Sequence, residues 1–257
     1  MNQISGSVII TGASDGIGRE MALLFAKRGF RLGLIARRGE LLQVLAVECR
    51  ALGAPLVETA AVDVTDSPAF RAGLNKLESA LGPTDYFIAN AGVTGRSSNS
   101  QDNWEDVKKT MMVNSLAAMD GLEWMKVRMV KRGSGTLVGV SSVAGTRGLP
   151  TSGAYSASKA ALTSYLETLR VDLRGTGVHV LTVAPGFIHT AMTAKNKGAM
   201  PFVIDVKPAA EIFVRGILAK KIFIVAPWQF RYIILLLTIV PRGLYDLATG
   251  SAMKKIR

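Results

Sequence analysis

Short, continuous apolar runs recur along the chain and alternate with longer runs in which apolar residues follow a helical period. The short runs predict strands buried on both faces, at 7–10, 31–36, 55–64, 85–91, 135–142, 177–185 and 222–227. The longer runs predict helices at 19–29, 39–52, 67–81, 104–131 and 208–219, and a further helix that contains Tyr155 and Lys159. Alternation of strand and helix indicates a parallel sheet with helices on both faces. We therefore expect one doubly wound α/β domain of the Rossmann type over residues 1–227, followed by an appendage at 228–257.

Polar residues and glycines follow several of the predicted strands at the point where each strand ends. These are the loop 11–18 after the first strand, Asp63 after the third, Asn90 after the fourth, Ser142 after the fifth, and Pro185 with Gly186 after the sixth. Doubly wound sheets bind their ligands beyond the carboxyl ends of the strands. The positions of these residues therefore predict one shared binding site.

The loop TGASDGIG, residues 11–18, joins the first predicted strand to the first predicted helix. Gly12, Gly16 and Gly18 permit a tight turn and allow backbone N–H groups to approach a phosphate at the start of the helix. The spacing differs from the usual Gly-x-Gly-x-x-Gly fingerprint, so a purely structural turn is the alternative interpretation.

Taken together, the motifs resemble those of the short-chain dehydrogenase/reductase family. The resemblance is carried by Thr11-Gly12-x-x-x-Gly16-x-Gly18, Asn90-Ala91-Gly92, Ser142 followed by Tyr155-x-x-x-Lys159, and Pro185-Gly186, all in this order. It covers residues 5–227 and implies a nicotinamide-dependent oxidoreductase with a seven-stranded sheet. A non-catalytic nucleotide-binding regulator on the same fold is the second interpretation, and an intact set of catalytic-type residues argues against it.

The resemblance also implies roles for individual residues around the cofactor. Asp63 and Val64 would meet the adenine, Asn90 to Gly92 would line the channel, and Ile188 with Thr190 would hold the nicotinamide amide. The complete set of expected cofactor contacts is Gly12, Ser14, Asp15, Gly16, Ile17, Gly18, Arg37, Arg38, Asp63, Val64, Asn90, Ala91, Gly92, Tyr155, Lys159, Pro185, Gly186, Ile188 and Thr190.

The end of the second predicted strand favours NADP as the cofactor in preference to NAD. An NAD site carries a carboxylate at this place to bind the ribose 2′-hydroxyl, whereas this chain has Arg37 and Arg38. Guanidinium groups fit a 2′-phosphate, although two solvated arginines at a helix start would look the same. Asp15 argues in the other direction, because some NADP-using relatives carry a basic residue there.

Tyr155 and Lys159 share one helix face, so both side chains can point into one cleft. The ammonium of Lys159 and a cationic nicotinamide would lower the pKa of Tyr155, which would then act as general acid or base on a carbonyl or alcohol. Lys159 would also bond the ribose hydroxyls, and Ser142 would hold the substrate oxygen. Family resemblance implies that Asn114 kinks its helix and carries a water to Lys159.

Composition and charge limit the classes of partner that the protein could bind, but they do not identify its substrate. The net charge of +12 favours anionic partners, but no basic recognition helix or other motif supports nucleic-acid binding. One cysteine and two histidines argue against a zinc site, so no metal is expected. The loop 189–206 contributes Met192, Met200, Phe202 and Val203, which suggests an apolar carbonyl or alcohol substrate.

The assembly and location of the protein are also expected from sequence patterns. Small residues on several faces of the helices containing Asn114 and Tyr155 favour a homodimer, or a tetramer, as the family resemblance does. The N-terminal residues carry neither early basic residues nor a long apolar stretch, so a cytoplasmic location is expected.

The appendage contains an apolar run from Tyr232 to Val240 that is too short to span a bilayer. Basic residues flank it, as in a helix that lies on the anionic cytosolic face of a membrane. Packing on a partner subunit, or covering the substrate pocket, is the interpretation that the length of the run favours over membrane contact, because buried apolar helices of about this length are common.

Overall fold

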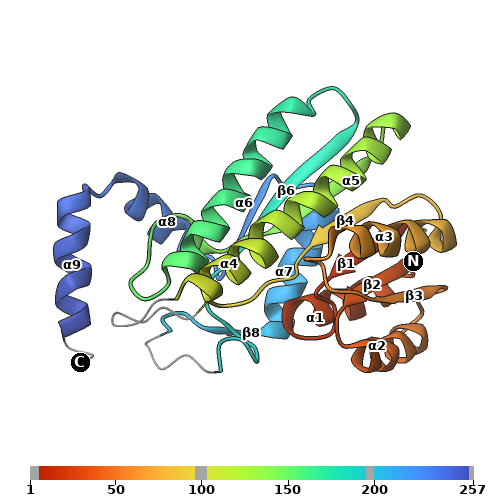
Figure 1. Cartoon of the computed structure of the whole chain (residues 1–257), viewed down its shortest axis with the longest axis horizontal. Coiled ribbons are helices and arrows are strands. Elements are labelled where there is room, and N and C mark those ends of the chain that lie inside the picture. The colour runs from red at the N-terminus through yellow and green to blue at the C-terminus, as the bar shows by residue number, and fades with distance from the viewer. Residues whose placement is uncertain (1–5, 96–102, 195–199, 255–257) are drawn as a thin grey trace.

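The computed structural model describes residues 6–95, 103–194 and 200–254 (Figure 1). A 7-stranded sheet in the order β3-β2-β1-β4-β5-β6-β9 forms its centre, and every neighbouring pair is parallel. The strands are β1 (Ser7–Thr11), β2 (Arg31–Ala36), β3 (Val57–Ala61), β4 (Tyr86–Ala89), β5 (Gly135–Val140), β6 (Val178–Pro185) and β9 (Phe223–Ala226). The doubly wound, seven-stranded architecture expected from the sequence is confirmed.

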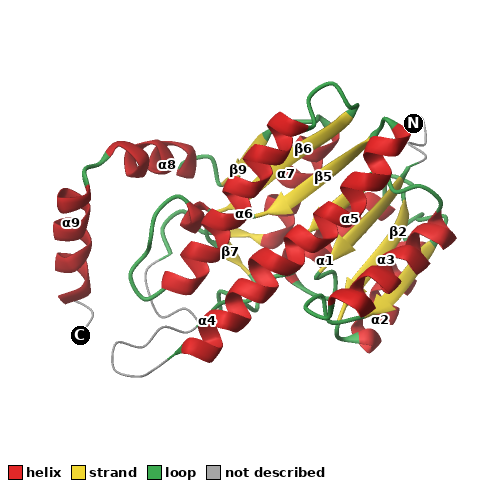
Figure 2. Ribbon diagram, turned by 45° about the horizontal axis from the view of Figure 1, so that its top comes forward, coloured by secondary structure: helices red, strands yellow, loops and turns green. Residues whose placement is uncertain are grey.

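Helices cover both faces of this sheet (Figure 2). One face carries α1 (Gly16–Ala26), α2 (Gly39–Ala51) and α7 (Val206–Leu218), and the other carries α3 (Ser67–Leu81), α5 (Ala117–Arg132) and α6 (Gly153–Asp172). A small pair of strands, β7 (Ile188–His189) and β8 (Ile204–Asp205), lies apart from the main sheet. The chain ends in α8 (Phe230–Ile239) and α9 (Arg242–Lys254), which extend away from the sheet (Figure 1).

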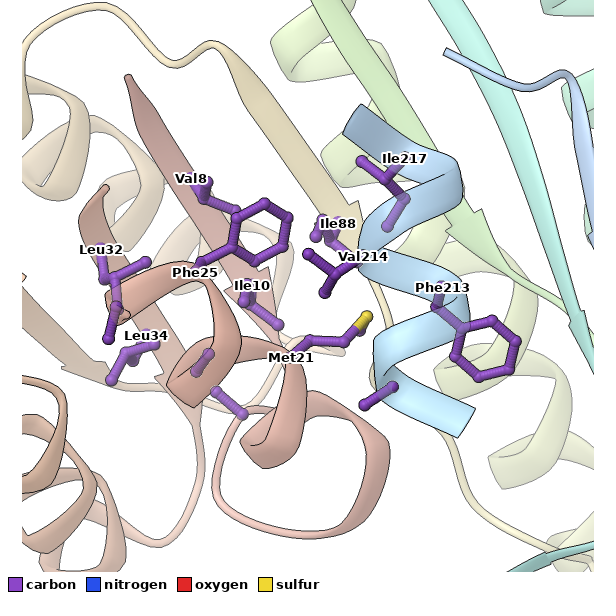
Figure 3. Packing of buried hydrophobic residues seen from close by; sticks show 14 of the residues in the cluster. Val8, Ile10, Met21, Phe25, Leu32, Leu34, Ile88, Phe213, Val214 and Ile217 are labelled. Atoms are coloured by element: carbon purple, nitrogen blue, oxygen red, sulfur yellow. The ribbon is translucent and has the colours of Figure 1, made fainter. Parts of the chain in front are cut away.

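The core on the α1 and α7 side shows how apolar periodicity becomes packing. Met21 and Phe25 of α1 meet Val214 of α7, above Val8 and Ile10 of β1 (Figure 3), and all of them are fully buried. Burial of a side chain of this size stabilises the fold by about 1.5–3 kcal/mol. The contact between two helices far apart in sequence fixes the position of α1, whose first turn faces the binding cleft.

Three strands end two or three residues earlier than the apolar runs predict. The expected strands 55–64, 85–91 and 135–142 are observed at Val57–Ala61, Tyr86–Ala89 and Gly135–Val140. The polar residues at their ends leave the ladder because they bond locally: Asp63 accepts from the N–H and hydroxyl of Thr65, and Ser142 caps the turn η2 (Val143–Gly145).

The predicted helix 104–131 is divided by a change of helical pitch. It consists of α4 (Trp104–Met111), a π-helical segment η1 (Met112–Leu116) and α5. Such a widened turn inserts one residue into the helix and is frequent at functional sites. Asn114, for which the sequence predicted a kink, lies inside this segment.

Candidate active site

A cleft of about 400 Å³ lies at the carboxyl ends of the strands. Its glycine loop follows β1 and its Asn90–Gly92 segment follows β4, so it lies at the point where the strand order reverses. The predicted residues that line it are Gly12, Ser14, Asp15, Gly16, Ile17, Arg37, Arg38, Asp63, Val64, Asn90, Ala91, Gly92, Tyr155, Lys159, Pro185 and Thr190. A volume of this size is typical of small-molecule and cofactor sites.

Five predicted site residues, Gly18, Asn114, Ser142, Gly186 and Ile188, lie behind or beside this surface and do not line the cleft. Ile188 is 3% exposed because it packs into the core beneath the cleft. Gly186 lies against the ring of Phe230, where a Cβ would come within 2.5 Å of the ring atoms. Their sequence positions placed them near the site, but the direction of each side chain depends on the fold around it.

Sequence reasoning also missed part of the lining. Ala36, Val62, Val93, Val113, Val140 and Ala191 line the cleft but carry no polar group that would single them out. Ser141, next to the predicted Ser142, lines it as well. Its Oγ donates to the carbonyl of Lys159 and bonds Thr163, so its side chain supports α6.

Asn90 holds the glycine loop in position. Its Nδ2 donates to the carbonyl oxygens of Thr11 and Gly12, at 2.9 and 3.2 Å. The Oγ1 of Thr11 accepts from the backbone N–H groups of Asn90 and Ala91, both at 3.0 Å. The end of β4 is thereby tied to the end of β1, and the loop keeps the shape that leads into α1.

The glycines of this loop meet two different structural requirements. Gly12 and Gly16 have φ of +66° and +56°, a region in which other residues are strained. Gly18 has no room for a side chain, because a Cβ would lie 2.5 Å from both the carbonyl oxygen of Gly12 and Nδ2 of Asn90. The first turn of α1 then directs its backbone N–H groups to the cleft, as a phosphate site requires.

Arg37 and Arg38 are exposed and both border the cleft near this loop. Arg38 donates to Oγ of Ser14 at 3.1 and 3.3 Å and pairs with Asp15 at 3.4 Å. Asp15 also caps α1, accepting from the N–H of Gly16 at 2.7 Å. Asp15 therefore orients Arg38 toward the loop, which accounts for an acid at this position beside a cationic site.

Arg37 faces the other side of the same region. Its Nη1 lies 3.7 Å from Oδ2 of Asp63. The hydrogen bonds from Thr65 lower the pKa of Asp63, first the backbone N–H and then the hydroxyl, with Arg37 adding to the effect. The Asp63 carboxylate is therefore ionised at neutral pH and its partner arginine is held at the cleft edge.

Tyr155 and Lys159 line the inner end of the cleft, and Ser142 lies beside them just outside the lining. The hydroxyl of Tyr155 is hydrogen-bonded to Ser142, whose Oγ also donates to the carbonyl of Pro185 at 3.3 Å. Nζ of Lys159 lies 5.9 Å from the centre of the Tyr155 ring. Three elements, η2, α6 and the end of β6, therefore fix the tyrosine hydroxyl and the lysine in one place.

Burial shifts the pKa values of both residues toward their neutral forms. It raises the pKa of Tyr155, against the opposing effect of the Ser142 hydrogen bond, and lowers the pKa of Lys159 to about 8. The protein groups therefore do not produce the lowering of the Tyr155 pKa that was expected from Lys159, and the lowering by a cationic nicotinamide stays a prediction. Desolvation of the phenol is the larger effect, and Nζ of Lys159 donates instead to the carbonyl of Val140 at 2.8 Å.

Asn114 supports the cleft from behind. Its amide group donates to the carbonyl of Val93 and to Oγ of Ser158, and its Oδ1 accepts from the N–H of Val93. A Cβ on Gly92 would lie 3.3 Å from Oδ1 of Asn114 and 3.6 Å from Nζ of Lys159, so both groups surround Gly92. The direct partners of Asn114 are thus Val93 and Ser158, and a water between Asn114 and Lys159 stays a prediction.

Residues 6–95, 103–194 and 200–254 contain no group of three or more metal-ligating side chains. Within these residues no helix has the length and apolar composition needed to cross a bilayer. Part of the predicted substrate loop, 195–199, lies outside the described residues, while Met192 lines the cleft and Phe202 is half exposed beside α8.

A doubly wound sheet with a glycine loop at its switch point, and a tyrosine–lysine pair in the adjoining cleft, are typical of a dinucleotide-binding oxidoreductase. The family model for short chain dehydrogenase matches residues 7–200. The chain therefore belongs to the short-chain dehydrogenase/reductase family and is an oxidoreductase of that family, which confirms the resemblance.

Individual relatives agree with this assignment. The chain is 40% identical over 242 residues to an uncharacterized oxidoreductase of Myxococcus xanthus, covering 94% of this chain and 95% of the relative. It is 33% identical to 11-beta-hydroxysteroid dehydrogenase-like 4A of Arabidopsis thaliana, with 91% and 80% covered. A short-chain dehydrogenase from Sphingobium yanoikuyae, solved in complex with NADPH, has a TM-score of 0.80 at 26% identity, with 98% and 96% covered.

Proposed function

We propose that the protein is an NADP-dependent enzyme that interconverts an apolar carbonyl compound and its alcohol, with Tyr155 as general acid and base. The observation that carries this proposal is the Tyr155 hydroxyl, bonded to Ser142 and close to the buried ammonium of Lys159. A hydroxyl positioned in this way can protonate a carbonyl oxygen in reduction and remove the proton in oxidation. When bound, the nicotinamide supplies or accepts the hydride.

The residues of the cleft fit a nicotinamide dinucleotide. The loop with positive-φ Gly12 and Gly16 presents backbone N–H groups for the pyrophosphate, and Lys159 can donate to ribose hydroxyls. Arg37 and Arg38 offer planar cationic groups at the edge for a 2′-phosphate. The Sphingobium yanoikuyae protein, whose chain aligns over almost its full length, binds NADPH, which supports this choice.

Each polar group of the cleft has a separate task in the proposed reaction. Ser142 holds the substrate oxygen near Tyr155, since it is itself fixed by Pro185 and by the N–H of Ala144. Lys159 stabilises the phenolate that forms when Tyr155 gives up its proton. The raised pKa of Tyr155 keeps it protonated at neutral pH, as proton donation in the direction of reduction requires.

An apolar substrate is supported by two features. Met192 is 40% exposed and lines the cleft, and Phe202, in the same predicted substrate loop, is 50% exposed. The Arabidopsis thaliana relative bears a name that refers to hydroxysteroids, which are apolar carbonyl or alcohol compounds. We include steroids, lipid aldehydes and other apolar ketones in the proposed class. The protein is further proposed to act as a homodimer or tetramer.

Substrate screening with both cofactors tests this function. The purified protein is incubated with a panel of apolar and polar carbonyl compounds and NADPH or NADH, and the nicotinamide absorbance is followed. The proposal expects oxidation of NADPH with apolar carbonyls and much slower turnover with NADH. If the protein binds NADPH but reduces none of the carbonyl compounds, and oxidises no alcohol with NADP, a nucleotide-binding regulator is the better description of its function.

A further inference from the structure

Helix α8 is apolar on nearly all sides, but the protein covers only one of them. Phe230 is 4% exposed and packs edge-on against the rings of Phe187 and Phe202, at centroid distances of 5.9 and 6.2 Å. Its opposite side carries Tyr232, Leu235, Leu236 and Ile239, which are 57–68% exposed. This spacing of i, i+3, i+4 and i+7 places the four side chains in one stripe.

The stripe continues beyond both ends of α8. The ring of Trp228, 64% exposed, meets Tyr232 edge to face at a centroid distance of 6.0 Å, and Leu244 at the start of α9 is 61% exposed. We call Trp228, Tyr232, Leu235, Leu236, Ile239 and Leu244 the outer apolar face. Exposed apolar side chains gathered in this way on a folded protein indicate an interaction site.

The outer apolar face is held on the body by specific bonds. Arg147 donates to the carbonyl oxygens of Leu237 and Val240, at 2.7 and 2.6 Å, and its guanidinium stacks on the ring of Tyr245 at 4.3 Å. The hydroxyl of Tyr245 donates to the carbonyl of Gly148 at 2.6 Å. Residues 147 and 148 follow the Ser142 loop, so the tail is attached beside the catalytic end of the cleft.

The polar groups of α8 are arranged for an apolar environment. Thr238 lies in the last turn of α8, and its Oγ1 donates to the carbonyl of Ile234 at 2.9 Å. The hydroxyl is thereby satisfied within the helix and needs no water. Arg147 satisfies carbonyls at the end of the helix, which removes another need for solvent.

Charge selects the kind of partner. Residues 220–257 contain seven basic side chains and one acid, Asp246, and the whole chain carries +12. Arg231 and Arg242 are exposed and lie next to the outer apolar face. A second copy of the chain would bring the same excess of positive charge to this surface, whereas an anionic surface would be attracted to it.

The length of α8 determines whether the helix could lie in the interface of a bilayer or cross the bilayer. At about 1.5 Å per residue a ten-residue helix is roughly 15 Å long, half the thickness of the hydrocarbon core of a bilayer. It can therefore lie in the interface and cannot cross. Helices that lie in the bilayer interface typically combine tryptophan and tyrosine with leucine and isoleucine and carry arginines at their ends, as this segment does.

We infer that the outer apolar face of α8 and α9 docks the protein on the surface of an anionic phospholipid bilayer. Tyr232, Leu235, Leu236 and Ile239 enter the boundary between headgroups and acyl chains, and Arg231 and Arg242 meet the lipid phosphates. Docking would place the Ser142 side of the cleft near the bilayer, where apolar carbonyl compounds concentrate. Only this last consequence rests on the proposed function, because lipid binding itself requires no catalysis.

Vesicle flotation of the full-length protein tests the inference. Vesicles of phosphatidylcholine mixed with phosphatidylglycerol are compared with pure phosphatidylcholine, at low and at high salt. The protein is expected to float with the anionic vesicles at low salt and to be released by high salt. The Leu235→Ser, Leu236→Ser double variant should bind roughly tenfold more weakly for each leucine removed from the interface.

A matched control introduces two serines at exposed apolar positions of another helix. Val44 and Val47 of α2 are 57% and 64% exposed, and the Val44→Ser, Val47→Ser variant should float like the wild type. The Arg231→Gln, Arg242→Gln variant should lose binding to anionic vesicles. All these positions are exposed, so circular dichroism should show the wild-type fold.

Three outcomes would overturn the inference. The first is that the wild-type protein remains unbound at low salt, and the second is that the leucine and valine pairs reduce flotation equally. The third is that no form of the protein floats, while the leucine variant differs from the wild type in molar mass by light scattering. That result would show that the outer apolar face binds a second copy of the chain. Inactivity toward carbonyl compounds in the screen, with flotation intact, would count against the proposed reaction and leave the docking surface standing.

Discussion

Nζ of Lys159 lies 5.9 Å from the centre of the Tyr155 ring and donates a hydrogen bond to the carbonyl of Val140, which is the last residue of β5. The lysine is 4% exposed and is held between the helix that carries the tyrosine and the strand that leads to Ser142. This arrangement keeps an ammonium beside the phenol while limiting its contact with water.

Replacement of Tyr155 by phenylalanine should abolish turnover and leave cofactor binding intact. The phenol is the proposed proton donor, and loss of a general acid costs a factor of roughly 10²–10⁴ in rate. Steady-state turnover and NADPH fluorescence titration measure the two effects separately. Tyr165→Phe is the matched control, because Tyr165 lies on the same helix and donates to Glu123 away from the cleft. A Tyr155→Phe variant that kept more than about a tenth of the wild-type kcat would contradict the assignment.

The pH dependence of activity should reflect Lys159. Burial lowers its pKa to about 8, so its ammonium is fully present below that pH and is lost as the pH rises through it. Values of kcat/KM for NADPH, which report on the free enzyme, should therefore fall above pH about 8. The raised pKa of Tyr155 keeps the proton donor protonated over the same range.

A variant with a permanent charge separates Lys159 from other titrating groups. Lys159→Arg keeps a cation that stays protonated throughout this pH range, so the alkaline limb should move upward or disappear. If the Lys159→Arg variant turns over too slowly for kinetic measurement, the pH dependence of its affinity for NADPH tests whether Lys159 produces the alkaline limb. An alkaline limb at the same pH in wild type and variant would show that another group produces it.

The sequence predicted the order of strands and helices because continuous apolar runs and helical periodicity follow directly from burial. It also predicted which residues stand at the carboxyl ends of the strands, since that edge is fixed once the strands are parallel. It did not predict that Asp15 would orient Arg38, or that Gly186 would lie against Phe230. Those relationships join segments far apart in the chain and depend on side-chain directions that no local pattern encodes.

The pKa of Tyr155 could not be predicted from the i, i+4 spacing alone. The spacing places Lys159 near the ring, but the desolvation that raises the pKa of the phenol comes from the surrounding fold. The interruption of the long helix is a related case. The sequence singled out Asn114, but the change to a π-helical turn follows from the bonds that Asn114 makes with Val93 and Ser158.

Removal of the cationic groups at the cleft edge should reduce the preference for NADPH. A charge-assisted bond to a phosphate contributes about 1.5–3 kcal/mol, so Arg37→Ala and Arg38→Ala should each lower kcat/KM for NADPH by tenfold or more. The value for NADH should change little. Arg71→Ala is the control, since Arg71 pairs with Asp120 outside the cleft. Equal kcat/KM for both cofactors in the wild type would contradict the NADP proposal.

A charged residue on the outward side of the π-helical segment should dissociate the proposed homodimer. Met112 and Leu116 are 40% and 51% exposed and lie one turn apart next to Asn114, on the helices proposed to meet the partner. Leu116→Glu would bury an unpaired carboxylate and should weaken association by at least tenfold. Light scattering at micromolar concentration measures the mass, with Val47→Glu of α2 as control. A monomeric wild type would refute the dimer.

The glycine loop offers a test of the cofactor site that involves no charged or catalytic residue. A methyl group on Gly18 would lie 2.5 Å from the carbonyl oxygen of Gly12 and 2.5 Å from Nδ2 of Asn90, well inside van der Waals contact. Gly18→Ala must therefore displace the loop or break the bonds that Asn90 makes to it, at a cost to stability of about 1–3 kcal/mol. Calorimetric titration should show NADPH affinity lowered by tenfold or more, because the backbone N–H groups lose their alignment.

The matched control, Gly243→Ala, is expected to keep or raise the stability of the folded protein. Gly243 lies in α9, and a methyl group added there would meet no atom of the described residues within 4 Å, so Gly243→Ala should fit without displacement. Alanine is the better helix former by about 1 kcal/mol, so this variant should unfold at the same or higher denaturant concentration and bind NADPH like the wild type. Both variants make the same chemical change, and only the one at Gly18 disturbs the approach of β4 to the loop. If Gly18→Ala bound NADPH as tightly as the wild type, the loop would not be the phosphate site and the cofactor would have to lie elsewhere in the cleft.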